Sequence, residues 1–175
     1  MHISFADRKR RLLSIEIFNA VIDAMGGCKS VAAHESARLV VVDGETTHRA
    51  AEMVYGDTRP QGNVHRKAAA IRKAAKALRD ALEPGGVPEP VFFGGERRLM
   101  RAAVFDAIAG VLPAPSASAI LVAARAVLVD GLPVEEATEA AYGGRKNARL
   151  VRRKVDMVCK LAAQLEQVFS AENIK

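Results

Sequence analysis

Residues 37–44 read Ala-Arg-Leu-Val-Val-Val-Asp-Gly, and residues 124–131 read Ala-Arg-Ala-Val-Leu-Val-Asp-Gly. The two strings lie 87 positions apart, and further matches keep that offset without a gap. Tyr55-Gly56 corresponds to Tyr142-Gly143, and Arg66-Lys67 corresponds to Arg153-Lys154. Because twice 87 nearly equals the 175 residues of the chain, the sequence predicts one unit written twice in tandem.

Each repeat has the pattern of four helices, because apolar residues recur at helical spacing between Gly and Pro residues. The helices expected in the first repeat cover about 6–25, 29–42, 46–55 and 60–82. Those expected in the second repeat cover about 96–111, 116–129, 133–142 and 146–171. The Pro- and Gly-rich stretch 85–95 is interpreted as a linker between domains 1–84 and 96–175. Only the run 39–42 could instead be a strand, so the predicted fold class is all-α, with two tandem four-helix units.

Composition excludes several classes of protein. Apolar residues make up 50% of the chain, but aromatic residues only 5%, so Ala, Val and Leu must build a core of closely packed helices. The two cysteines and four histidines show no metal-ligand spacing, and no Gly-rich phosphate loop or catalytic triad is apparent. No apolar run is long and pure enough for a membrane span or a secretory signal. The sequence therefore predicts a cytoplasmic protein that is not an enzyme and needs neither cofactor nor metal.

Positive charge is concentrated in two equivalent places. The formal net charge is +6, from 26 Lys and Arg against 20 Asp and Glu. Residues 58–79 hold seven Lys and Arg and no acid, and residues 145–160 hold seven against one Asp. More than half of all cations thus lie in, or directly before, the last predicted helix of each repeat, which favours an anionic partner over a general solubility role.

Helical phase separates these cations from the apolar residues of the same two helices. At about 100° per residue, one face is apolar and the opposite face is basic in both repeats. The apolar faces comprise Val64, Ala68, Ile71, Ala75, Leu78 and Leu82, and Val151, Val155, Val158, Ala162, Leu165 and Phe169. The opposite faces comprise Arg59, Gly62, Arg66 and Lys73, and Lys146, Arg149, Arg153 and Lys160.

A short helix, a Gly-containing turn and a helix with an apolar back and a basic front are typical of a helix-turn-helix. The first turns of the second helix would enter the major groove, where Arg pairs with guanine and Asn or Gln with adenine. The remaining cations would neutralise phosphates. The candidate DNA-contacting residues are Arg59, Gln61, Asn63, His65, Arg66, Lys67 and Lys73 in the first repeat, and Arg145, Lys146, Asn147, Arg149, Arg152 and Arg153 in the second.

Two alternatives remain open at this point. The basic helices could be solvated faces, or they could belong to a helical interaction module that binds an acidic protein or RNA. The repeats also differ, since His48-Arg49 in the first becomes Glu135-Glu136 in the second. Acidic residues at the start of a helix interact favourably with the helix dipole. They would also repel phosphates and weaken DNA binding by the second repeat.

The string Ala124–Pro133, the short helix after it and the segment Arg145–Val155 together resemble the helix-turn-helix of plasmid TrfB/KorA-type repressors. A weaker copy runs from Ala37 to Ile71. This resemblance implies a small all-helical bacterial transcription regulator of a plasmid, phage or integrative element, with double-stranded DNA as its partner. RNA polymerase or a second regulator is a further candidate partner. The tandem copy would replace a dimer partner and give a monomeric pseudo-dimer, with a homodimer as the alternative.

Overall fold

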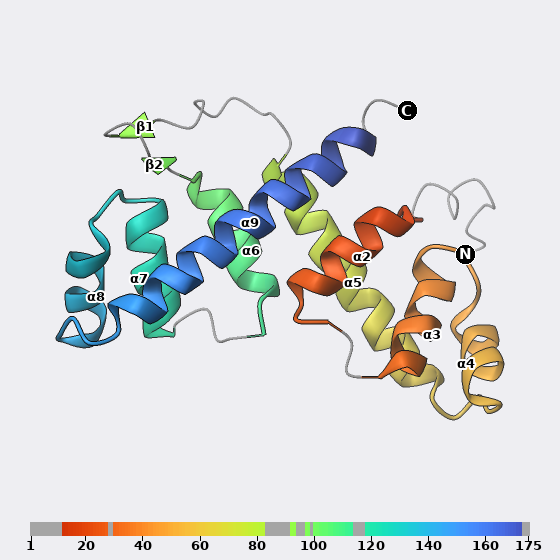
Figure 1. The fold of residues 1–175 in the computed structure, drawn as a ribbon. Helices are drawn as coiled ribbons and strands as arrows, with labels where there is room; N and C mark the ends of the chain where they lie inside the picture. The colour runs from red at the N-terminus through yellow and green to blue at the C-terminus, as the bar shows by residue number, and fades with distance from the viewer. Residues whose placement is uncertain are drawn as a thin grey trace. The chain divides into compact units, whose positions relative to one another are not determined.

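The computed structural model describes residues 12–27, 30–82, 92–93, 97–98, 100–113 and 118–172. Within these ranges the fold is all-helical, as predicted, with eight helices and one pair of two-residue strands (Figure 1). The chain forms two compact units, an N-terminal unit, Met1–Ala77, and a C-terminal unit, Leu78–Lys175. The predicted repeat ends at 84 and 96, and the predicted linker 85–95 apart from 92–93, lie outside the described residues.

The first four helices are α2 (Ile15–Ala24), α3 (Val31–Val41), α4 (Thr47–Tyr55) and α5 (Gln61–Leu82). Three of them begin at a hydroxyl cap, because Ser14, Ser30 and Thr46 each accept a backbone N–H from three residues later. The helix expected over 6–25 therefore starts only at Ile15 within the described residues, and 6–11 lie outside them. Residues 39–42, considered as a strand, instead form the end of α3 and its C-cap.

The C-terminal unit contains α6 (Ala102–Val111), α7 (Ala119–Leu128), α8 (Val134–Tyr142) and α9 (Ala148–Glu172). The strands β1 (Phe92–Phe93) and β2 (Arg97–Arg98) pair antiparallel before α6. The prediction of a helix from 96 is therefore wrong at 97–98. The backbone N–H of Met100 donates to the Leu128 carbonyl at 2.6 Å, which holds this part of the chain against the end of α7 rather than in a helical turn.

Helix bounds recur at the offset seen in the sequence. Each end of α2 lies 87 residues before the corresponding end of α6, and the same holds for α4 and α8. Gly56 and Gly143 end α4 and α8 in the left-handed region, with φ of 67° and 70°, where a residue without Cβ is least strained. Even the bond from Met100 has a counterpart 87 residues earlier, from the Leu13 N–H to the Val41 carbonyl at 3.0 Å.

The repeated string 37–44 and 124–131 ends a helix and turns the chain into the next one. Its arginine and aspartate form an ion pair, at 2.9 Å between Arg38 and Asp43 and at 3.5 Å between Arg125 and Asp130. In both copies the N–H four residues after the arginine donates to the arginine carbonyl at 2.8 Å. The spacing between the arginine and the aspartate, which is the same in both repeats, therefore has a structural explanation that is independent of any ligand.

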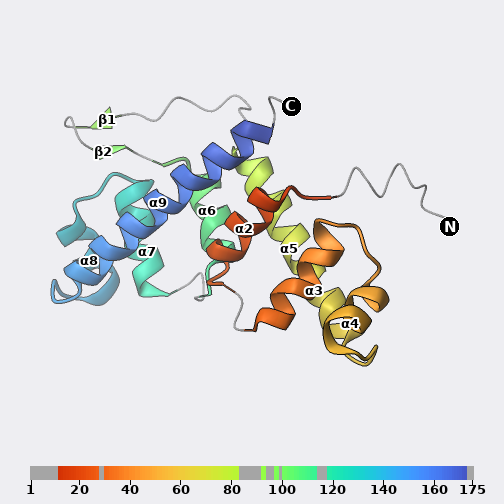
Figure 2. The same ribbon diagram turned by 45° about the vertical axis from the view of Figure 1, so that its right-hand side comes forward.

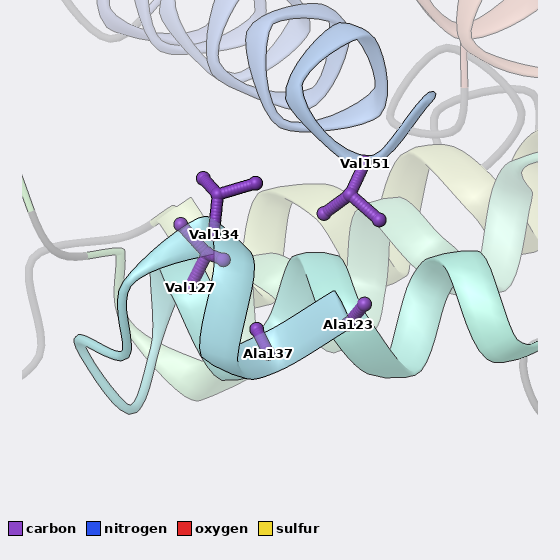
Figure 3. Packing of buried hydrophobic residues seen from close by; sticks show 5 residues of the cluster. All are labelled: Ala123, Val127, Val134, Ala137 and Val151. Atoms are coloured by element: carbon purple, nitrogen blue, oxygen red, sulfur yellow. The ribbon is translucent and has the colours of Figure 1, made fainter. Parts of the chain in front are cut away.

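Small side chains form the core between α7, α8 and α9 in the C-terminal unit. Figure 3 shows Val127 and Ala123 of α7, Val134 and Ala137 of α8, and Val151 of α9 gathered between these helices. Because alanine and valine are short, the three helices pack closely, and Figures 1 and 2 show α8 and α9 beside α7. In the N-terminal unit, α3 packs against α4 in the same way.

Candidate nucleic-acid interface

The long helices α5 and α9 have one buried and one exposed face, which confirms the predicted phase. Val64, Ile71, Val151 and Val158 are at most 2% exposed. Leu82 and Val155, on the same stripes, are half-buried. Every residue predicted for the opposite faces is exposed, namely Arg59, Gly62, Arg66 and Lys73, and Lys146, Arg149, Arg153 and Lys160.

The end of α5 belongs to the C-terminal unit. Arg101 Nη2 donates to the Ala81 carbonyl at 2.7 Å, and the Arg79 guanidinium lies 5.7 Å from the centroid of the Phe169 ring. The C-terminal part of α5 is therefore engaged by protein contacts. Its N-terminal turns, in the other unit, carry the candidate residues.

In the N-terminal unit the candidates surround the start of α5. Arg59 is held by Asp57, which accepts both its backbone N–H, at 2.9 Å, and its guanidinium. These two interactions, the backbone one first, lower the pKa of the Asp57 carboxyl and keep it anionic, so the charge of Arg59 is compensated. Gln61 Nε2 donates to Thr47 Oγ1 at 3.4 Å, which links α5 to the short helix α4.

The remaining candidates of this unit are less constrained. Arg66 Nη2 donates to Asn63 Oδ1 at 2.5 Å, and both side chains are exposed on the first two turns of α5. His65 and Lys73 are also exposed, and Lys67 is half-buried. None of the three cations Arg66, Lys67 and Lys73 has an ion pair among the residues that the structure describes.

In the C-terminal unit, α8 supplies acids to two of the candidates. Arg145 Nε donates to Glu139 at 2.9 Å, and Arg152 bonds Glu135. All four side chains are more than 40% exposed, so each pair contributes at most about 1 kcal/mol to stability. Glu135 was expected to interact with the helix dipole, whereas Glu139 had no predicted role in the interface. Both carboxylates also compensate arginines that were predicted to contact DNA.

Three of the candidate cations in this unit have no ion pair among the residues that the structure describes. These are Lys146, Arg149 and Arg153, and all three are exposed. Asn147 is half-buried and precedes α9, where its carbonyl accepts the N–H groups of Leu150 and Val151 at 2.9 and 3.1 Å. The predicted side chain thus lies at the entry of the helix rather than on its first turn.

Two exposed apolar residues lie among these cations and were not predicted. Leu150 is 48% exposed and Met157 is 37% exposed, both on the outer side of α9. A signal existed for Leu150, because it precedes Val151 of the apolar stripe and so points about 100° away from it. An apolar side chain beside arginines adds the ability to contact a methyl group or an aliphatic surface.

The described part of the chain contains neither a metal-ligand cluster nor a membrane-spanning helix. No group of three His, Cys, Asp or Glu residues there could hold a metal ion. Among the helices described, none has the length and apolar character needed to cross a bilayer. No protein-family model, curated protein or solved structure matches this chain.

Proposed function

We propose that this protein binds double-stranded DNA with two helix-turn-helix heads and regulates transcription. The first head consists of α4 and the N-terminal turns of α5, and the second of α8 and the N-terminal turns of α9. One observation carries the proposal: at positions 87 apart, both long helices combine a buried apolar back with an exposed front that bears cations without carboxylate partners in the described residues.

Each part of a head has a physical role in this proposal. The short helix, α4 or α8, braces the long helix, and the left-handed glycine at Gly56 or Gly143 sets the angle between them. Arg66, Arg149 and Arg153 can donate to guanine edges or phosphates, and Asn63 can pair with adenine. The neighbouring lysines neutralise phosphates. Covering a promoter in this way would repress a gene, as in the plasmid repressors that the sequence resembles.

In the second head, fewer positive charges are expected to be available to DNA than the number of arginines suggests. Glu139 and Glu135 compensate Arg145 and Arg152. Since these pairs are exposed, a phosphate can take the place of either carboxylate, but the displaced acid then lies close to the DNA backbone. The uncompensated residues Arg149 and Arg153 should therefore dominate DNA binding by this head.

The test is fluorescence anisotropy with a random duplex of about 30 base pairs at two salt concentrations, such as 50 and 200 mM. We expect affinity to fall steeply with salt, and the double variant Arg149→Ala, Arg153→Ala to reduce the log–log slope by about 1 for each lost phosphate contact. The matched variant Arg145→Ala, Arg152→Ala removes the same charge from the same head and should have a smaller effect. Binding that is independent of salt, or unchanged in Arg149→Ala, Arg153→Ala, would overturn the proposal. Tighter binding to RNA or to an acidic protein would then favour an interaction module.

Use of both heads on one DNA site is tested separately in the full chain. Asn63→Ala with Arg66→Ala disables the first head, and Arg149→Ala with Arg153→Ala disables the second. If both heads engage one site, either variant should lose most of the affinity for a specific sequence and shorten the protected footprint. A variant that loses one head and keeps the affinity and the footprint of the wild type would refute joint binding.

A further inference from the structure

The surfaces of the two heads differ although their scaffolds match. Within the first ten residues of α5 and α9, six positions are exposed in both helices. Five of the six carry different residues. The pairs, each 87 apart, are Gly62 and Arg149, Asn63 and Leu150, His65 and Arg152, Arg66 and Arg153, Ala69 and Asp156, and Ala70 and Met157.

The buried positions between them behave differently. Val64 and Val151 are identical, and Ile71 and Val158 are both β-branched and at most 1% exposed. One buried pair is thus identical and a second keeps a β-branched side chain, although the buried Ala68 corresponds to the half-buried Val155. The outward-facing residues differ more in their chemistry.

We infer that the two heads read different base sequences, so that the DNA site consists of two unlike boxes in a fixed order. This inference rests on the proposed DNA binding and deepens it. A protein with two identical heads would select the same box twice. This chain would instead bind its site in one orientation only.

The first head is suited to adenine. Asn63 offers an amide that can bond the N6 and N7 atoms of adenine together, and Arg66 orients it through the 2.5 Å bond to Oδ1. Gly62 precedes it inside the helix, where glycine is unfavourable relative to alanine. A Cβ at Gly62 would meet no atom of the protein within 4 Å, so packing does not require the glycine. An absent side chain at this point allows the helix to approach the groove floor closely enough for the short Asn63 to reach a base.

The second head is suited to guanine and thymine. Arg149 stands where the first head has Gly62, and it has no ion pair in the described part of the chain. Its guanidinium can donate two bonds to the O6 and N7 atoms of guanine. Leu150 stands where the first head has Asn63; it cannot bond a base edge, but its exposed methyl groups can contact the C5-methyl of thymine.

The test is selection of bound sequences from a random duplex library by the full chain, followed by the same selection with single variants. The wild type should select two unlike boxes, one with a required adenine and the other with guanine and thymine. Asn63→Ala should relax the first box only, and Leu150→Ala the second box only, each by a factor of about 5 to 150 at one base pair. Leu150→Asn should give the second box a new preference for adenine. The control Gln164→Ala, an exposed position of α9 beyond the first turns, should leave both boxes intact.

Several results would overturn the inference and leave DNA binding standing. These are two copies of one box, no enriched sequence although the protein binds random duplex DNA, or variants at Asn63 and Leu150 that change the same box. If the wild type shows no salt-dependent binding of duplex DNA at all, the proposed function fails and this inference fails with it.

Discussion

Replacement of Val151 by alanine is expected to destabilise the C-terminal unit, whereas replacement of its neighbour Leu150 should not. Val151 is fully buried in the first turn of α9, against Ala123 and Val127 of α7 and Val134 and Ala137 of α8 (Figure 3). Leu150 is 48% exposed. Adjacent residues of one helix therefore offer a matched pair, in which the exposed one loses more carbon atoms than the buried one.

The magnitude follows from the surroundings of the two side chains. Val151→Ala removes two buried carbons, each contributing about 0.8 kcal/mol through burial, or about 1.6 kcal/mol together. The neighbouring side chains are short alanines and valines, which cannot extend into the space left behind, so a cavity term brings the loss to about 2–3 kcal/mol. Leu150→Ala changes an exposed position and should alter the free energy of unfolding by less than about 0.5 kcal/mol.

Urea unfolding followed by far-UV circular dichroism measures both losses. With a typical slope of about 2 kcal/mol per molar urea, Val151→Ala should lower the midpoint by about 1–1.5 M, and Leu150→Ala by no more than about 0.25 M. For DNA affinity we expect the opposite ranking. Leu150→Ala should weaken binding more than Val151→Ala, because Leu150 faces outward whereas Val151 lies in the core. A Leu150→Ala variant that is as destabilised as Val151→Ala would refute the assignment of the faces of α9, and with it the role given to Leu150.

Three further predictions concern single features of the two units. Glu135→Gln with Glu139→Gln should raise affinity for duplex DNA several-fold in anisotropy titrations, because two carboxylates near the phosphates are neutralised and their arginine partners are released; weaker binding would contradict this. Gly143→Ala should lower the free energy of unfolding by about 1 kcal/mol in thermal or urea denaturation, since alanine is strained at φ of 70°; an unchanged midpoint would contradict it. Hydrogen bonds from Arg38 lower the pKa of the Glu35 carboxyl, so the folded state favours its ionised form. The advantage of the wild type over Glu35→Gln should therefore be full above pH of about 4.3 and disappear as the pH falls through the lowered pKa, and a urea midpoint difference that grows at pH 3 would refute it.

Most of the helical framework could be predicted from local pattern. The two turns that contain Gly56 and Gly143 and the buried faces of α5 and α9 follow from residues a few positions apart. The repeat offset follows from comparing the sequence with itself. Predicted helix starts were less accurate where long-range bonds decide them. The helix predicted from 96 begins at Ala102, because the Met100 N–H bonds a carbonyl at the end of α7 and Arg97–Arg98 pair with another strand.

The candidate interface, too, could be predicted from the sequence only in part. Helical periodicity is a property of the local chain, so the amino-acid order alone was sufficient to separate the buried stripe from the basic front of each long helix. Which arginines remain uncompensated depends on distances between helices. Glu135 reaches Arg152 across 17 positions, and Glu139 reaches Arg145 around the turn after α8. Packing of α8 against α9 brings Glu135 and Arg152 within bonding distance, because a contact between two helices depends on the core side chains that set their separation and angle.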